Sequence, residues 1–210
     1  MWAGALFDAL QTLQPDTAVE VDDLRLALRG GFPWHRPDHV RTRTDAAGWW
    51  SALHPLFASA YQAAGVPEQL ATAAIDRVGD AYYRVDAWEL IDGAVDALQL
   101  TAAAGYRNAI LSNHGPELPH LVAALGLDSF VDRVFTSALI GVEKPNRLIF
   151  EHALTALGAN GDSWMIGDNP IADVDGARAV GMQAILADGA YPDARGVTVV
   201  EAAQQLVRAH

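Results

Sequence analysis

Four short groups of polar residues along this 210-residue chain have the side chains that phosphate chemistry uses. They are Asp8, Ser112-Asn113, Lys144-Pro145 and Gly167-Asp168 with Asp173 nearby. Carboxylate oxygens suit Mg²⁺, which proteins usually hold with one or two carboxylates, water and substrate phosphate. A carboxylate can also attack phosphorus, while an ammonium and a hydroxyl can hold phosphate oxygens. These residue types predict a site for Mg²⁺ and a small phosphorylated, anionic substrate.

Lys144 is the single lysine among the 14 basic residues, and all the others are arginine. Pro145 follows it and is typical of a helix start, so Lys144 is predicted to lie just before a helix. Lysine offers a compact point charge, whereas arginine offers a planar fork. A lysine at this one position therefore favours a phosphate pocket that needs a compact ammonium.

The elements that must position these groups follow from the hydrophobic pattern. The apolar run 2–7, which ends at Asp8, predicts a buried parallel strand. From Gly93 onward strands and helices alternate. The predicted helices are 93–105, 116–125, 146–157, 171–180 and 201–208, and the predicted strands are one ending at Leu111, then 133–136, 163–166 and 183–186. This alternation predicts an α/β fold, a Rossmann-like parallel sheet with helices on both faces, whose strands end on one rim.

Residues 14–92 differ from this alternation. The stretches Asp45 to Ala64 and Pro67 to Arg84 have apolar residues at helical spacing, although Pro55 argues against one continuous helix in the first. We therefore predict a core domain of residues 1–13 and 93–210, with an inserted, all-helical cap domain of residues 14–92. The tryptophans of the insert are expected to pack in its interior.

Composition excludes several function classes. Cysteine is absent, which rules out disulfides, thiolate metal sites and a cysteine nucleophile. A net charge of −12 disfavours nucleic-acid binding. No apolar run is long enough to predict a membrane span, and the first residues do not resemble a signal peptide, so a cytoplasmic location is expected. Composition does not determine the oligomeric state.

The ordered groups resemble the four motifs of the haloacid dehalogenase (HAD) superfamily. The matching residues are Asp8 with Thr12-Leu13, Ser112-Asn113, Lys144-Pro145, and Gly167 to Asp173 followed by Gly176-Ala177. The resemblance implies a HAD-like core with a helical cap. It implies that Asp8 is the nucleophile, that Ser112 binds the phosphoryl group and that Lys144 stabilises both. Asp8, Asp168, Asp173 and the Leu10 backbone carbonyl would hold Mg²⁺. Asn113 would either orient the loop or touch substrate.

The first motif departs from the family pattern. Phosphatases of the family carry a second aspartate, an acid–base group, where this chain has Leu10, and a glycine where it has Gln11. A positioned acid–base group contributes roughly 10²–10⁴ in rate. Three readings stay open: a slow Mg²⁺-dependent phosphatase, a 2-haloacid dehalogenase, or a HAD-fold binding or scaffold protein. Candidate replacement acids are His114, His35 and His39, and the arginines that could receive an anionic substrate are Arg36, Arg41 and Arg43.

Overall fold

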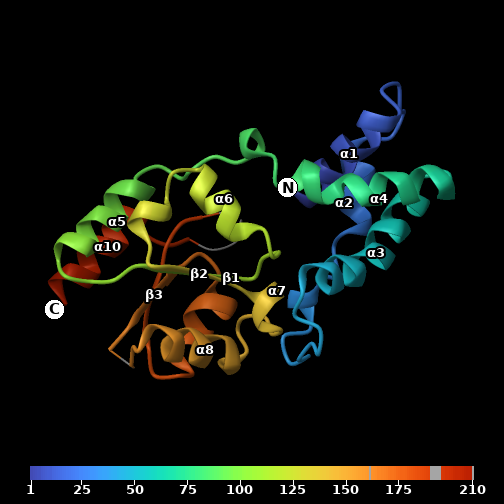
Figure 1. Ribbon diagram of the computed structural model, residues 1–210. Helices are drawn as coiled ribbons and strands as arrows, with labels where there is room; N and C mark the ends of the chain where they lie inside the picture. The colour runs from blue at the N-terminus through green and yellow to red at the C-terminus, as the bar shows by residue number, and fades with distance from the viewer. Residues whose placement is uncertain (161, 190–194, 210) are drawn as a thin grey trace. The chain divides into compact units, whose positions relative to one another are not determined.

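The computed structural model describes residues 1–160, 162–189 and 195–209. They form two compact units. Unit 1 consists of Met1–Arg36 and Asp45–Trp88, and unit 2 of Pro37–Thr44 together with the described residues from Glu89 onward. Figure 1 shows the elements of both units.

Unit 1 is helical. Its elements are α1 (Trp2–Leu13), α2 (Val21–Ala27), η1 (Pro33–His35), α3 (Ala46–Ala63), α4 (Glu68–Tyr82) and η2 (Val85–Ala87). Helix α1 packs on α4 and α2, and α3 packs on α4. Asp45 caps α3 by accepting a hydrogen bond from the Gly48 N–H at 2.6 Å, and the helix continues through Pro55 without a break. The two long helices predicted for this region are confirmed.

The predicted first strand is wrong. Residues 2–13 form the single helix α1, and this helix lies in unit 1 rather than with the α/β unit. Trp2, Leu6 and Leu13 fall at helical spacing, and the segment is rich in helix-favouring alanine and leucine without any Val, Ile or Thr before Thr12. A six-residue apolar run satisfies a strand and a buried helix turn equally well, so packing against α4 decided between them.

Aromatic side chains fill much of the interior of unit 1. Trp2 stacks on Tyr82 with ring centroids 3.9 Å apart, and its ring also lies 6.1 Å from that of Trp49 and 5.7 Å from that of Phe57. Trp49 and Phe57 are fully buried. The expectation that these tryptophans pack rather than face solvent is confirmed for Trp49, while Trp50 is half-buried.

Unit 2 alternates helices and strands as predicted. Its elements are α5 (Ala94–Ala103), β1 (Ala109–Ser112), α6 (Leu118–Ala124), η3 (Asp128–Phe130), β2 (Arg133–Thr136), α7 (Ser137–Ile140), α8 (Arg147–Leu157), β3 (Trp164–Gly167), the π-helical turn η4 (Pro170–Asp175), α9 (Gly176–Arg178), β4 (Gln183–Leu186) and α10 (Val199–Arg208). The predicted helix 171–180 is replaced by the π-helical turn and the short α9.

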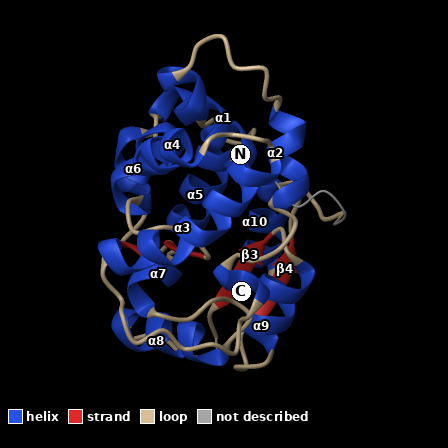
Figure 2. Ribbon diagram, turned by 90° about the vertical axis from the view of Figure 1, so that its right-hand side faces the viewer, coloured by secondary structure: helices blue, strands red, loops and turns tan. Residues whose placement is uncertain are grey.

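The strands pair in parallel as two separate two-stranded sheets among the described residues. Strand β1 pairs with β2, with Ser112 opposite Thr136, and β3 pairs with β4, with Gly167 opposite Leu186. Figure 2 shows β3 and β4 side by side. Helix α10 packs on α5 and against β3, whereas α8 packs against α9. The parallel Rossmann-like architecture is confirmed, although β1 and β3 are not hydrogen-bonded to each other in the described part of the chain.

One apolar cluster joins β1 and β3. Ile149 and Phe150 of α8 are fully buried, and Leu111 of β1 and Met165 of β3 both pack against this cluster. Gly176 has no space for a Cβ, because a carbon there would lie 2.8 Å from the Phe150 ring and 3.0 Å from the Pro145 Cα. This close approach brings the loop that contains Lys144 against the turn after β3.

Candidate functional site

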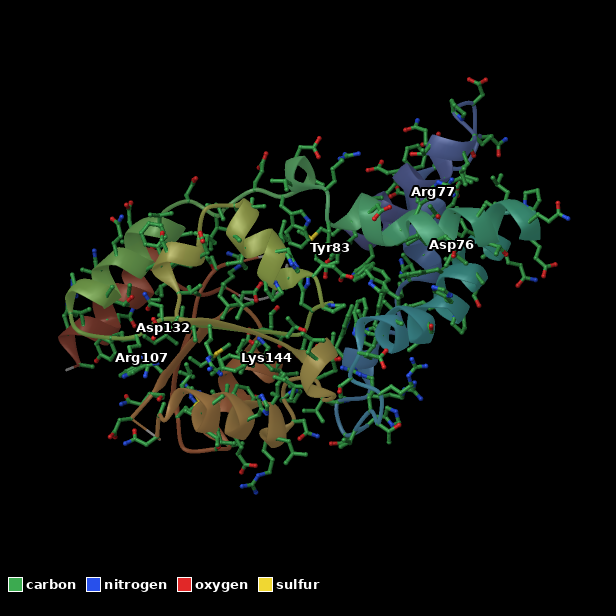
Figure 3. All side chains as sticks on the ribbon, viewed as in Figure 1. Asp76, Arg77, Tyr83, Arg107, Asp132 and Lys144 are labelled. Atoms are coloured by element: carbon green, nitrogen blue, oxygen red, sulfur yellow. The ribbon has the colours of Figure 1, made fainter. Side chains whose placement is uncertain are left out.

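Lys144 is buried where β1 and β3 end. Its Nζ donates a hydrogen bond to the Leu111 carbonyl at 2.7 Å and lies 2.5 Å from Asp173 Oδ1. The two side chains are only 9% and 5% exposed. By contrast, the ion pair of Arg107 with Asp132 is largely exposed, and Figure 3 labels both pairs' basic residues. A buried ammonium therefore links the ends of the two sheets.

Asn113 holds the backbone of Lys144 from the side of β1. Its Oδ1 accepts a hydrogen bond from the Lys144 N–H at 2.6 Å, and its Nδ2 donates to the Lys144 carbonyl at 2.9 Å. The peptide bond from Lys144 to Pro145 is cis. Both polar groups of the Asn113 amide are thus occupied by the loop. Of the two roles left open from the sequence, this geometry is that of loop orientation.

The turn after β3 presents two carboxylates in different surroundings. Asp173 Oδ2 accepts a hydrogen bond from the Asn169 N–H at 3.0 Å, so both oxygens of this buried side chain face a donor. Gly167 leaves room for Asp173, because a Cβ there would overlap its carboxylate. Asp168 lies half-buried against Gly189, where an added Cβ would lie 2.7 Å from its Oδ2. Asn169 caps the turn by accepting from the N–H groups of Ile171 and Ala172.

Ser112 ends β1 and is half-buried, opposite Thr136 of β2. Ser112, Lys144, Asp168 and Asp173 therefore all belong to unit 2, at or just beyond the carboxyl ends of β1 and β3. This is the rim at which parallel sheets bind ligands. Among these residues, Lys144 Nζ contacts the Asp173 carboxylate directly.

Asp8 and Leu10 do not have the backbone setting that the sequence predicted for them. Asp8 lies within helix α1 of unit 1, where its Oδ2 is 3.6 Å from an Arg84 amino group and its carbonyl accepts from the Thr12 hydroxyl. Leu10 is fully buried, and its carbonyl accepts a hydrogen bond from the Gln14 N–H at 2.9 Å. The expected metal-binding carbonyl is therefore engaged in the helix, and no strand delivers Asp8.

Arg41 and Glu143 form a buried ion pair that sequence reasoning missed. Arg41 Nη1 lies 2.5 Å from Glu143 Oε1, with side chains 11% and 1% exposed. Arg41 was expected to receive an anionic substrate, but its guanidinium is instead directed at Glu143 and at the Ser137 carbonyl. The only sign of this pair in the sequence is that an acidic residue, Glu143, precedes Lys144. The sequence does not indicate which basic residue pairs with it. Arg36 and Arg43 are exposed.

His114 follows the Ser112-Asn113 group and is largely buried. Its backbone N–H donates to the Ser137 hydroxyl at 3.1 Å. Burial lowers the pKa of the imidazole from 6.5 to about 4, against a smaller opposing effect of a hydrogen bond with the Gly115 backbone. The ring is therefore neutral at neutral pH and has no proton to give as a cationic acid.

Mg²⁺ suits the donor chemistry at the end of β3. Asp168 offers hard carboxylate oxygens, and Mg²⁺ needs only one or two such ligands when water and substrate phosphate complete its shell. Asp173 faces Lys144 Nζ with one oxygen and accepts from the Asn169 N–H with the other. No group of three or more His, Cys, Asp or Glu side chains able to hold a metal occurs among the described residues.

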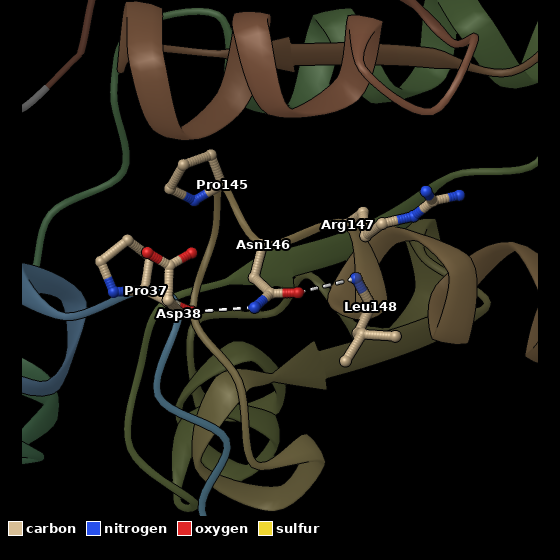
Figure 4. Close-up of a pocket in the computed structure, with 6 residues that line it drawn as sticks. All are labelled: Pro37, Asp38, Pro145, Asn146, Arg147 and Leu148. Atoms are coloured by element: carbon tan, nitrogen blue, oxygen red, sulfur yellow. Dashed lines mark hydrogen bonds between the residues drawn. The ribbon is translucent and has the colours of Figure 1, made fainter.

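A shallow pocket of about 540 Å³ lies beside the loop that contains Lys144. Figure 4 shows its lining residues, which are Pro37, Asp38, Pro145, Asn146, Arg147 and Leu148. Asn146 joins its two walls, since its Nδ2 donates to the Pro37 carbonyl and its Oδ1 accepts from the Leu148 N–H, both at 3.0 Å. All of these residues belong to unit 2.

Comparison with known proteins gives a family and a fold. The family model described as haloacid dehalogenase-like hydrolase matches residues 6–181. The human haloacid dehalogenase-like hydrolase domain-containing protein 3 is 32% identical over 160 residues, which are 75% of this chain and 61% of that protein. The chain thus spans about three fifths of the length of such curated relatives.

Two further matches show less: one covers only part of the chain, and the other shows a likeness of fold. A glyceraldehyde 3-phosphate phosphatase of Methanothermobacter thermautotrophicus is 36% identical over 114 residues, which are 49% of this chain and 50% of the relative. The solved structure of a 2-haloacid dehalogenase from Pseudomonas syringae pv. Tomato DC3000 has a TM-score of 0.63 at 18% identity, covering 100% of this chain and 92% of that one. At that identity the likeness is one of fold. Within the described residues, no helix is both long enough and apolar enough to cross a membrane.

Proposed function

The chain belongs to the haloacid dehalogenase-like hydrolase family, and from that membership we propose that it is a Mg²⁺-dependent phosphatase of a small phosphorylated metabolite. The observation that carries the proposal is the buried Lys144, held between the Leu111 carbonyl and Asp173. In a chain of net charge −12, a fixed ammonium at the carboxyl ends of β1 and β3 is a local centre of attraction for a phosphate group.

The proposal gives a role to each of the polar residues that lie near the ends of β1 and β3. Lys144 Nζ and the Ser112 hydroxyl bind phosphoryl oxygens, and Asn113 holds the Lys144 backbone in place. Asp168 is the protein ligand for Mg²⁺, with Asp173 as the residue that orients Lys144. When bound, Mg²⁺ withdraws charge from the phosphate oxygens. Phosphatases among the relatives, such as the archaeal glyceraldehyde 3-phosphate phosphatase, support a phosphorylated substrate.

The attacking group is the second part of the proposal. Following the motif resemblance, an Asp8 oxygen bonds to phosphorus as the ester P–O bond breaks, and the leaving alkoxide takes a proton from solvent water to become the alcohol. Water then splits the aspartyl-phosphate, returning the carboxylate and releasing phosphate. The group that protonates the leaving alcohol is not Leu10, which has no proton to transfer. Asp8 is carried by α1 rather than by a strand, so its role needs a direct test.

One observation favours a second function, which is binding without turnover. The Leu10 carbonyl is engaged by Gln14, and Asp8 has a neighbouring cation in Arg84 within unit 1. A chain in which these residues are structural would keep a phosphate site in unit 2 and lack a nucleophile from α1. Such a protein would bind a phosphorylated ligand and leave it intact.

Phosphate release from p-nitrophenyl phosphate with and without Mg²⁺ tests the proposal. We expect turnover that EDTA abolishes, and that Asp8→Asn and Lys144→Met both remove. Asp76→Asn, an exposed carboxylate of α4, serves as the matched control and should keep wild-type turnover. Turnover that survives Asp8→Asn would reject the assigned nucleophile.

Ligand binding separates the alternatives when turnover is absent. A rise in melting temperature with inorganic phosphate and Mg²⁺, lost in Lys144→Met, would support the binding protein. Halide release from a 2-haloacid without metal would identify a dehalogenase instead. The absence of all three responses would reject a phosphate site at Lys144.

A further inference from the structure

Residues Pro37–Thr44, here called the strap, belong to unit 2 although both flanking stretches of sequence belong to unit 1. The strap has no helix or strand of its own. Val40 is 52% exposed, so this side chain adds little apolar burial to the attachment of the strap. Polar contacts join the strap to unit 2 as well.

Hydrogen bonds join the strap to the stretch from Ser137 to Asn146. At one end of the strap, the Pro37 carbonyl accepts from Asn146 Nδ2 at 3.0 Å. Near the other end, the Arg41 N–H donates to the Gly141 carbonyl at 2.8 Å. Gly141 has a φ of +95°, and an added Cβ would lie 3.0 Å from the Arg41 carbonyl, so glycine is required for this approach.

The Arg41 side chain contributes two more contacts through its guanidinium. Nη2 donates to the Ser137 carbonyl and Nη1 to Glu143 Oε1, each at 2.5 Å. Glu143 is 1% exposed, and the Arg41 guanidinium beside it neutralises a carboxylate that has lost nearly all its water. The fork of arginine reaches both acceptors at once, which the single ammonium of lysine does less well.

Glu143 is joined by one peptide bond to Lys144. Asn113 holds the Lys144 backbone from β1, and Arg41 holds the preceding residue from the strap. The loop is therefore fixed on both sides of the peptide that leads to the Lys144 side chain. Displacing Glu143 would move the Lys144 backbone relative to the Leu111 carbonyl and Asp173.

We propose that Arg41 is a positioning residue for Lys144, acting through Glu143. It makes the phosphate site of unit 2 depend on a residue from the strap, outside the contiguous stretch 89–210. The inference rests on the proposed function in so far as Lys144 is taken to bind phosphate. The placement of Lys144 itself is a separate quantity that can be measured without any ligand.

The single lysine makes that measurement direct. Protein grown with ¹³C,¹⁵N-lysine gives the signals of Lys144 alone, both its backbone N–H and its side-chain Cε. We expect Arg41→Gln, which adds no second lysine, to shift or broaden these signals and to weaken binding of inorganic phosphate about tenfold, as loss of a supporting contact does at metal sites. Arg133→Gln removes the charge of an exposed arginine at the start of β2 in the same way, and it is the matched control that should leave both unchanged.

A paired variant separates positioning from stability. Arg41→Met with Glu143→Gln removes both buried charges, so it should regain much of the melting temperature that Arg41→Met alone loses. We expect its Lys144 signals and phosphate affinity to stay altered despite the recovered stability. Wild-type lysine signals in Arg41→Gln, or in the stable paired variant, would overturn the inference. If the wild-type chain fails to bind phosphate, the proposed function fails, and the lysine signals still decide the role of Arg41.

Discussion

Three residues hold Lys144, two at the end of β1 and one in the turn after β3. Leu111 supplies a carbonyl, Asp173 a carboxylate and Asn113 a bidentate amide. A buried ion pair is weak evidence for stability, since desolvation of both charges opposes their attraction. The pair lies at the ends of β1 and β3, where the proposed function places the phosphate group.

At the scale of one residue, His114 should make stability depend on pH. Its pKa is about 4 in the fold and 6.5 ordinarily, so between these values the unfolded chain binds a proton that the folded chain does not. The free energy of unfolding should fall as the pH drops from 6.5 to 4, by up to about 3 kcal/mol. Urea unfolding at several pH values measures it.

Substitution identifies the histidine responsible. His114→Gln should flatten the dependence on pH across this window, whereas His120→Gln, at an exposed position of α6, should keep it. An unchanged slope in His114→Gln would show that another group carries the effect.

At the scale of elements, α8 and the strap share one residue. Asn146 is the N-cap of α8, and the same amide donates to the Pro37 carbonyl. A side chain with one acceptor and one donor can serve a helix end and a passing segment together. The start of α8, which follows Lys144 and Pro145, is in this way tied to the strap.

Two substitutions at Asn146 should separate these roles. Asn146→Asp keeps the acceptor for the Leu148 N–H but places a carboxylate oxygen near the Pro37 carbonyl. It should leave Leu148 protected in hydrogen exchange and speed exchange at the Arg41 amide. Asn146→Ala should speed both and lower the free energy of unfolding by about 1 kcal/mol.

A second cap supplies the control for this prediction. Thr198→Ala removes the N-cap of α10 elsewhere in unit 2, where the Thr198 hydroxyl accepts from the Glu201 N–H. It should cost a similar free energy without changing exchange at Arg41. Equal exchange at Arg41 in all three variants would mean that Asn146 does not hold the strap.

At the scale of the whole molecule, the two units differ in the residue types of their cores. Unit 1 has a core rich in aromatic side chains, and unit 2 has a core of aliphatic residues and Phe150 around α8. Five of the six tryptophans lie in unit 1, and Trp164 of β3 is the one in unit 2. Tryptophan fluorescence therefore reports mainly on unit 1.

This division predicts probe-dependent unfolding in the presence of ligand. Inorganic phosphate with Mg²⁺ should raise the temperature of the transition that involves unit 2, as binding to a folded state does. In Trp164→Phe, fluorescence should report unit 1 alone and show a smaller shift than far-UV circular dichroism, which sees both units. Identical shifts by both probes would show that the units unfold as one cooperative body.

The sequence by itself determined the α/β alternation from Gly93 onward. Strands such as 133–136 and 183–186 were predicted at their observed bounds. These short segments lie between helices with clear ends, and they are too short to show the hydrophobic periodicity of another helix. It also determined that Lys144, Asp168 and Asp173 lie near strand ends, since parallel strands finish on one rim. The family follows from the same motifs and is confirmed by the family model.

Only the tertiary structure decided between helix and strand for residues 2–13. The run is short and apolar throughout its first turns, so its hydrophobic pattern fits both, and packing on α4 made it a helix. The Arg41–Glu143 pair was hidden for a different reason. Its two residues are separated by 102 positions in the sequence. No local sequence pattern indicates that a buried carboxylate contacts the strap. Burial creates the need for that partner, and burial exists only in the folded chain.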